Sequence, residues 1–162
     1  MQHATADLCD EYIDRLQVVD PMFADFGGIG MFEGEIYTLK VYEDNTLVRN
    51  ILEKDGSGKV LVIDGGGSFR CALVGDNLAA LAVANGWRGL LVYGCIRDVR
   101  QIMDMELGVK ALGSTPVKSV KRNEGQENIP LRFGGVDFIP GHYLYADIDG
   151  IVVAECQLIL SE

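Results

Sequence analysis

The sequence predicts a single α/β domain with a mixed sheet, extending over residues 1–162. A short apolar run at residues 60–63 is typical of a strand that is covered on both faces. An Ala- and Leu-rich segment at 76–85 precedes a second apolar run at 89–93, which gives the strand–helix–strand order of a βαβ crossover. After residue 108 the chain turns to short β-like pieces separated by Pro and Gly.

Two further helices are expected before this crossover. Residues 5–16 predict an N-terminal helix with Thr5 as its N-cap. The β-branched and aromatic residues of 30–42 are typical of strands. Residues 45–54 predict a second helix, with Asn45 as its cap.

The middle of the chain is punctuated by glycine. The run DGGG after residue 63 predicts a sharp turn, and residues 69–74 predict another strand. The helix at 76–85 is apolar on nearly all sides and is closed by Gly86, so we expect it to be mostly buried. Later pieces such as VKALG, RFGGVDFIPG and DGIVVAE predict short strands, with Gly134 and Gly135 at a bend.

Composition limits the classes of function. A chain of 162 residues that is 48% hydrophobic and 23% charged suits one globular domain. The formal net charge of −10 argues against direct nucleic-acid binding, because an acidic surface repels phosphates. The start MQHATADLCDEYIDRL has no signal-peptide pattern, and no apolar run could span a bilayer. We therefore expect a cytoplasmic protein without a membrane partner.

Several residue types carry no catalytic pattern. The four cysteines form no CxxC pair, which indicates neither disulfides nor a zinc site, although Cys95 lies close to Arg97. The run from Asp64 to Ser68 lacks the Lys of a Walker A loop, and Ser68 has no evident His–Asp partners. We interpret His142 as structural and expect His3, near the terminus, to be disordered. The basic cluster of Lys118, Lys121 and Arg122 is interpreted as a solvated loop.

The start of the helix at 76–85 is the first candidate site. Ligands in α/β proteins gather beyond the carboxyl ends of strands and at the starts of the following helices. The backbone N–H groups of Gly75, Asp76, Asn77 and Leu78 lack partners within the helix, so they suit a carboxylate or phosphate. The absence of a side chain at Gly75 allows a ligand to approach closely.

Arg97 and Asp98 form the second candidate group, directly beyond the predicted strand at 89–93. An Arg side chain can bind a carboxylate or a keto oxygen with several donors, and Asp is a hard ligand for Mg²⁺ or Mn²⁺. Together with the helix start, they would suit a small 2-oxo acid and a divalent metal. The alternative is that Asp76 is only a helix cap and that Arg97 and Asp98 are ordinary surface residues.

The segment DGGGSFRCALVGDNLAALAVANGWRGLLVYGCIRD resembles the RraA-like branch of the class II aldolase family. So do LCDEYIDRLQVVDPMFADFGG near the start and RFGGVDFIPGHYLYADIDGIVV near the end, which extends the resemblance over essentially the whole chain. The aldolases of this family share an acid, twenty intervening residues and then Arg-Asp. Asp76, Arg97 and Asp98 have this spacing.

The resemblance implies a swivelling β/β/α fold and a homotrimer with the site at a subunit boundary. Some members are metal-dependent aldolases that cleave 4-hydroxy-4-methyl-2-oxoglutarate to pyruvate and decarboxylate oxaloacetate. Others bind ribonuclease E and inhibit it. The first activity is the predicted function, and non-catalytic regulation of ribonuclease E is the alternative.

The resemblance also implies roles for individual residues. Backbone groups of Gly75, Asp76, Asn77 and Leu78 would bind the substrate carboxylate, Arg97 the oxygens near the keto group, and Asp98 the metal. In one respect the chain departs from the larger aldolases: the segment after Asp98 reads Val-Arg-Gln-Ile-Met, without an acid three residues on. The resemblance therefore assigns neither the other metal ligands nor the general base.

Overall fold

The computed structural model describes residues 2–161 and has a mixed α/β architecture. The helices are α1 (Thr5–Tyr12), a 3-10 helix (Ile13–Arg15), α2 (Thr46–Leu52), α3 (Asp76–Ala84) and α4 (Val99–Ile102). The strands of the main sheet are β1 (Leu16–Val18), β2 (Ala24–Asp25), β3 (Phe32–Lys40), β4 (Lys59–Asp64), β5 (Ala72–Val74), β6 (Gly89–Ile96), β7 (Gly108–Ser114), β8 (Gln126–Glu127), β11 (Tyr143–Ala146) and β12 (Ile151–Ala154). A separate ribbon consists of β9 (Leu131–Phe133) and β10 (Val136–Phe138).

The main sheet combines a parallel centre with antiparallel flanks, which confirms the predicted α/β class with a mixed sheet. Its strand order is β1-β12-β11-β3-β4-β6-β7-β2, and β5 and β8 pair with β6 and β3 beside this path. Strands β3, β4, β6 and β7 are parallel. The parallel pairs β3–β4 and β4–β6 confirm the predicted crossover, because α2 and α3 lie between their strands in the sequence.

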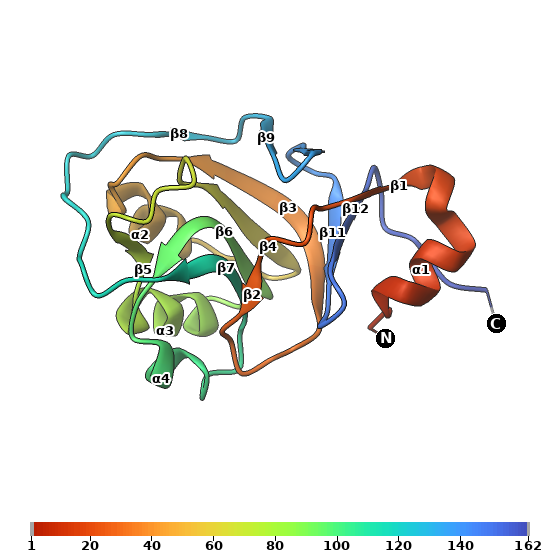
Figure 1. The fold of residues 1–162 in the computed structure, drawn as a ribbon, viewed down its shortest axis with the longest axis horizontal. Coiled ribbons are helices and arrows are strands. Elements are labelled where there is room, and N and C mark those ends of the chain that lie inside the picture. Colours follow the sequence, from red (N-terminus) through yellow and green to blue (C-terminus); the bar gives the residue numbers. More distant parts are fainter. Residues whose placement is uncertain (1, 162) are drawn as a thin grey trace.

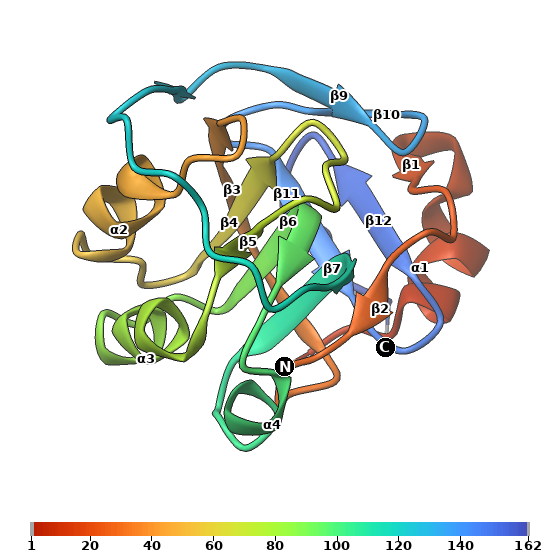
Figure 2. The same ribbon diagram turned by 60° about the vertical axis from the view of Figure 1, so that its left-hand side comes forward.

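The sheet is covered on both faces. Leu90 and Val92 of β6 belong to the apolar core on the side of α2 and α3, whereas Leu91 belongs to a core shared with the β9–β10 ribbon. Such burial on both faces explains the uninterrupted apolar sequence of β6. Figures 1 and 2 show α2 and α3 together on one side of the sheet, away from α1.

Two predicted elements have different lengths in the structure. The strand expected at residues 69–74 is only Ala72–Val74, and Phe69 is 59% exposed. Strand β6 runs to Ile96 rather than residue 93, so Arg97 follows it without a gap. Pairing with both β4 and β5 explains this length, because β5 continues the ladder at Cys95 and Ile96 beyond the end of β4.

Helix α3 is less buried than its composition predicts. Leu78, Ala79 and Ala82 are buried against the core, but Val83 is 39% exposed and Ala84 also faces solvent. The expectation of a mostly buried helix was wrong because α3 packs on the sheet with one face only. Apolar content without periodicity does not reveal which face is covered.

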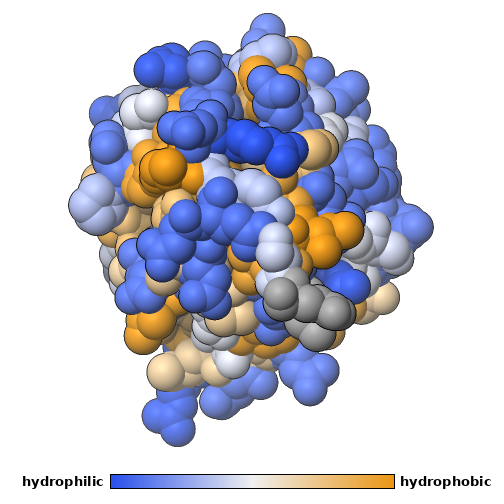
Figure 3. Space-filling model, turned by 90° about the vertical axis from the view of Figure 1, so that its right-hand side faces the viewer, coloured by the Kyte–Doolittle hydropathy of each residue, from blue (hydrophilic) through white to orange (hydrophobic). Residues whose placement is uncertain are grey.

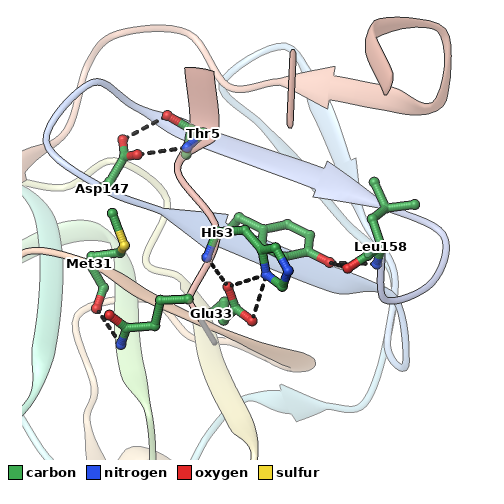
Figure 4. Close-up of polar contacts among 8 residues, drawn as sticks. His3, Thr5, Met31, Glu33, Asp147 and Leu158 are labelled. Atoms are coloured by element: carbon green, nitrogen blue, oxygen red, sulfur yellow. Dashed lines mark hydrogen bonds and ion pairs between the residues drawn. The ribbon is translucent and has the colours of Figure 1, made fainter. Parts of the chain in front are cut away.

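The predicted N-terminal helix is too long, since α1 ends at Tyr12 and Leu16 already belongs to β1. Thr5 is not the N-cap, which is Ala4. The Thr5 hydroxyl and backbone N–H instead donate to the carboxylate of Asp147, each at 2.7 Å (Figure 4). The start of α1 is thereby joined to the β11–β12 hairpin.

The expected disorder of His3 was also wrong. His3 is 9% exposed, and its backbone N–H donates to Glu33 Oε2 at 3.0 Å (Figure 4). Its ring Nδ1 lies 3.1 Å from the same oxygen, and the ring packs edge-on against Tyr145. These contacts order the N-terminal segment against β3 and β11.

The face that carries α1 and both chain ends is mainly hydrophilic, with several separate apolar patches (Figure 3). Within residues 2–161, no helix combines the length and the apolar character that a membrane span requires.

Trp87 belongs to the core at 4% exposure, and its indole N–H donates to the carbonyl of Lys54 at 3.2 Å.

Candidate active site

One pocket brings together all six residues that the sequence predicts for the site. It lies where β5 and β6 end and α3 begins, and its cavity has a volume of about 120 Å³. The predicted residues that line it are Gly75, Asp76, Asn77, Leu78, Arg97 and Asp98. This position, beyond the carboxyl ends of parallel strands, is where ligands bind in open α/β sheets.

Asp98 is held in an unusual backbone conformation at the edge of the pocket. Its φ of 59° and ψ of 39° are left-handed, a region that Asp and Asn tolerate better than most L-residues. The Asp98 Oδ2 atom accepts the backbone N–H of Asp76 at 3.1 Å. A Cβ atom at position 75 would lie only 2.7 Å from this oxygen, so Gly75 makes the contact possible.

Arg97 is joined to the end of β5 and to the segment after β7. Its backbone N–H donates to the Val74 carbonyl at 2.9 Å, and its Nη1 donates to the Pro116 carbonyl at 3.4 Å. Its Nε lies 3.9 Å from Asp98 Oδ2, and the Arg97 side chain is 40% exposed. The guanidinium therefore keeps donors available to a bound anion.

The start of α3 already binds carboxylate oxygens in this structure. Asp98 accepts the N–H of Asp76, and the Asp76 side chain accepts the N–H of Asn77 at 2.8 Å. The N–H of Ala79 donates to the Gly75 carbonyl and begins the helical ladder. Two of the four amides predicted for a ligand carboxylate, those of Asp76 and Asn77, are thus paired with carboxylates of the chain itself at the start of this nine-residue helix.

The sequence did not indicate the other wall of the pocket. It is lined by Asn45, the N-cap residue of α2, and by Arg49 within that helix, together with Lys118, Ser119 and Lys121 from the segment after β7. The basic cluster lies in an exposed segment outside the helices and strands, as interpreted from the sequence, and its two lysines also line the pocket. Figure 2 shows this segment crossing the end of β5 toward α2, and the Ala72 N–H donates to the Val117 carbonyl at 2.7 Å.

A buried carboxylate fixes this second wall. Asn45 is the N-cap residue of α2, as predicted, but its side chain makes no capping hydrogen bond. The preceding residue supplies the acceptor: Asp44 Oδ1 accepts the N–H of Thr46 at 2.9 Å and the Thr46 hydroxyl at 2.6 Å. Its Oδ2 accepts the N–H groups of Arg122 and Glu124 at 2.8 and 3.1 Å. Burial alone would raise the pKa of Asp44, but these hydrogen bonds lower it to about 2.

Two polar atoms of this wall have no hydrogen-bond partner among the residues that the structure describes. They are Asn45 Oδ1 and Ser119 Oγ, both covered from solvent, and Ser119 as a whole is 6% exposed. Buried polar atoms are nearly always hydrogen-bonded. Their presence beside the pocket indicates that this wall is suited to a polar ligand.

The electrostatic character of the pocket is opposite to that of the whole chain. Four basic side chains and two carboxylates line it, whereas the chain has a net charge of −10. The basic side chains belong to Arg49, Arg97, Lys118 and Lys121. This arrangement attracts a small anion, particularly one with more than one negative group.

The oxygen donors fit a hydrated hard cation. Within residues 2–161, no three His, Cys, Asp or Glu side chains gather into a ligand cluster, so a caged zinc ion is not supported. Mg²⁺ commonly keeps several waters and takes one or two protein carboxylates. Asp98, whose side chain is 35% exposed at this pocket, can supply such a carboxylate.

Other chemically interesting side chains do not join the site. Burial raises the pKa of Cys95, which is fully buried and therefore a poor nucleophile. The Ser68 hydroxyl donates to Glu43 at 2.8 Å, which gives it a structural role in the glycine-rich turn. His142 does not line the pocket.

Comparisons with known proteins point to one family. A family model described as RraA-like, Aldolase/RraA, matches residues 5–153. A curated protein from Aromatoleum aromaticum is 60% identical over 159 residues, which cover 98% of this chain and 100% of that protein. Its name assigns it provisionally as a 4-hydroxy-4-methyl-2-oxoglutarate aldolase.

Two solved structures share the fold almost completely. A Geobacillus kaustophilus protein, titled S-adenosylmethionine:2-dimethylmenaquinone methyltransferase, has a TM-score of 0.96 at 49% identity, with 99% of each chain covered. The RNA-processing inhibitor RraA from Thermus thermophilus has a TM-score of 0.94 at 42% identity, with 98% of this chain and 96% of that chain covered. The names of these relatives therefore include three different activities on one fold.

Proposed function

The chain belongs to the RraA-like family, and on that premise we propose that it is a divalent-metal-dependent aldolase. Its substrate is 4-hydroxy-4-methyl-2-oxoglutarate, which it cleaves to two molecules of pyruvate. Oxaloacetate decarboxylation is the proposed side activity. Relatives that are 53–60% identical and bear this aldolase name support the proposal.

The observation that carries the proposal is the meeting of Arg97, Asp98 and the start of α3 in one pocket. A 2-oxo acid presents a carboxylate and a keto oxygen side by side. The α3 amides suit the carboxylate, and the Arg97 guanidinium suits the oxygens near the keto group. Asp98 is the proposed metal ligand.

In the proposed reaction, the C4 hydroxyl loses its proton and becomes the keto group of one pyruvate. The C3–C4 bond breaks, and its electron pair remains on the other fragment as pyruvate enolate. Protonation at C3 then gives the second pyruvate. Arg97 places positive charge where the enolate oxygen develops negative charge, which lowers the barrier without rearrangement of the protein.

A bound divalent cation would supply Lewis-acid stabilisation of that same oxygen. Oxaloacetate loses CO₂ with the same placement of the electron pair, so one site serves both reactions. Asp98 also holds the N–H of Asp76 and thereby fixes the start of α3 relative to Arg97. A single carboxylate, that of Asp98, thus orients the start of α3 relative to Arg97.

Methyl transfer, the activity in the name of the Geobacillus relative, is less compatible with this pocket than aldol cleavage. Cavities for drug-sized ligands are commonly about 300 Å³ or larger. A cavity of about 120 Å³ that is lined mainly by charged and polar residues suits a small acid better than a nucleoside cofactor. We therefore favour the aldolase over methyl transfer.

A second candidate function is regulation of ribonuclease E by protein–protein contact. The similarity to the Thermus RNA-processing inhibitor favours it. The acidic chain would complement a basic segment of a ribonuclease. Binding to ribonuclease E that survives Asp98→Asn would place this function outside the pocket, whereas loss of binding would place it within.

We also propose a homotrimer with the pocket near a subunit boundary. Four large apolar side chains remain more than half exposed in segments that follow β3, β4 and β7: Tyr42, Phe69, Val117 and Val120. Exposed apolar groups of this kind mark interaction surfaces. Light scattering should give three times the chain mass of 17.7 kDa, and a monomer at micromolar concentration would contradict the proposal.

Pyruvate release from oxaloacetate tests the proposed site chemistry. Purified protein is assayed with Mg²⁺ or Mn²⁺ and then with EDTA, and metal-catalysed background decay is subtracted. Turnover that disappears with EDTA and in Arg97→Ala supports a pyruvate-enolate site. Turnover unaffected by either change would contradict the proposed roles.

A further inference from the structure

The pocket has a second group of polar side chains away from Asp98. We name it the distal wall and define it as Asn45, Arg49, Ser119 and Lys121. Strand β4 lies between β3, which leads into α2, and β6, which leads into Arg97. The two ends of the pocket are therefore about two strand spacings, roughly 10 Å, apart.

We infer that the distal wall binds the second carboxylate of a dicarboxylic 2-oxo acid and selects diacids over monoacids. The Arg97–Asp98 end takes the 2-oxo acid group. The inference rests on the proposed function and adds the residues that determine substrate specificity. Long Arg and Lys side chains allow a short diacid to reach both ends.

The helix geometry places Asn45 and Arg49 on one face. The Arg49 N–H donates to the Asn45 carbonyl at 3.4 Å, and residues four apart in a helix lie above one another. Both line the pocket. An Arg side chain offers paired donors that match the two oxygens of a carboxylate.

The backbone of Lys121 is fixed on both sides. The Val120 N–H donates to the Glu43 carbonyl at 3.2 Å, and the Arg122 N–H donates to Asp44 Oδ2 at 2.8 Å. Asp44 is thus a positioning residue for this wall. It also accepts the N–H of Thr46 at the start of α2, so one carboxylate positions the backbone of Lys121 relative to the helix that carries Arg49.

The basic groups of the distal wall are not neutralised by the chain itself. Among residues 2–161, neither Arg49 nor Lys121 forms an ion pair. The Ser119 hydroxyl, in a residue that is 94% buried, likewise has no hydrogen-bond partner there. Two unpaired basic side chains and an unpartnered hydroxyl from the lining of one pocket form a suitable environment for a carboxylate.

Binding of two matched ligands tests the inference without requiring turnover. Calorimetry in the presence of Mg²⁺ compares 2-oxoglutarate with 2-oxopentanoate, which has the same number of carbons but lacks the second carboxylate. We expect Arg49→Gln and Lys121→Gln to weaken 2-oxoglutarate binding roughly ten- to a hundredfold. Binding of 2-oxopentanoate should change less than about twofold, since it lacks the group that the distal wall binds.

Lys54→Gln provides the matched control, because Lys54 is exposed and lies outside the pocket. Lys121→Arg should retain the preference for the diacid. Equal loss for both ligands, or no loss for either, would overturn the inference while leaving the 2-oxo acid site intact. If the unmodified protein binds neither ligand, the proposed function fails and the inference fails with it.

Discussion

At the scale of single residues, the contact between Gly75 and Asp98 decides how the site is built. The backbone at Gly75, with φ of −121°, is accessible to alanine, so a methyl group there acts only through its volume. We expect Gly75→Ala to displace the Asp98 carboxylate, because the new Cβ would lie 2.7 Å from Oδ2. The value of kcat/KM for aldol cleavage should fall at least about tenfold, or roughly 1.4 kcal/mol.

Circular dichroism should show that Gly75→Ala retains its fold and nearly its melting temperature. Gly30→Ala is the control, since a Cβ at position 30 meets no atom within 4 Å. Unchanged activity in Gly75→Ala would mean that the Asp98 geometry does not matter for the reaction.

Residue-level features of the site were only partly predictable. The spacing of Asp76, Arg97 and Asp98 indicated residues that meet in one pocket, because strand and helix ends converge in α/β folds. The left-handed conformation of Asp98 was not foreseen, since nothing in a local Arg-Asp-Val sequence requires it. Asn45 was correctly predicted as the N-cap residue of α2, but only the structure shows that the Asp44 side chain, rather than that of Asn45, accepts the Thr46 N–H.

At the scale of elements, Asp44 joins helix α2 to the segment after β7. Asp44→Asn should lower the free energy of unfolding by about 2 kcal/mol at neutral pH, because four donors lose a charged acceptor. Chemical denaturation measures this change. Asp55→Asn is the control, because Asp55 is exposed and, among the described residues, its carboxylate accepts hydrogen bonds only from Ser57.

The same carboxylate predicts a pH dependence. The pKa of Asp44 is about 2 in the folded protein, below an unfolded value of about 3.9. Its stabilisation is therefore complete above about pH 4 and disappears as the pH falls through about 2. The stabilities of the unmodified protein and Asp44→Asn should converge over this range. A constant difference from pH 6 to pH 2 would contradict the assignment.

The location of Lys118 and Lys121 shows why the sequence did not predict the second wall of the pocket. Lys118 and Lys121 lie in a segment without helix or strand periodicity, so the sequence indicated only a loop. Their approach to the pocket depends on hydrogen bonds to Glu43 and Asp44, which lie more than seventy residues away in the chain. Contacts of this kind leave no local pattern, whereas the β4–α3–β6 order does.

At the scale of the whole molecule, the first and last segments are held together by Asp147. Burial alone would raise the pKa of Asp147, but hydrogen bonds from Thr5, Asp149 and Gly150 lower it below its ordinary value. Its stabilisation is thus present above the unfolded pKa and is lost as the pH falls below it. Asp147→Asn should lower the free energy of unfolding by about 1–3 kcal/mol at pH 7.

Amide hydrogen exchange provides the sharper measurement for Asp147→Asn. Protection should decrease in α1 and the β11–β12 turn while the parallel centre of the sheet stays protected. Asp149→Asn serves as the control, because its exposed side chain takes no part in these bonds. Uniform loss of protection across β4 and β6 would contradict a local role.

The fold class was predictable from the apolar runs of β4 and β6 because strands buried on both faces need them. Short flanking strands such as β1 and β11 were not, because their pairing depends on partners distant in sequence. Residue Leu16 illustrates this: its spacing suited the predicted helix, yet it pairs with Ala154 in the sheet.

We propose that this pocket cleaves a 2-oxo acid through a pyruvate enolate. The most direct test of this proposal measures pyruvate released from 4-hydroxy-4-methyl-2-oxoglutarate with Mg²⁺, for the unmodified protein and Asp98→Asn. Asn keeps the side-chain shape and tolerates the left-handed backbone, so the fold should persist. We predict two pyruvates per substrate and at least a hundredfold loss of kcat, roughly 2.7 kcal/mol, in the variant. Absence of pyruvate from the unmodified protein, or equal rates in both proteins, would contradict the account.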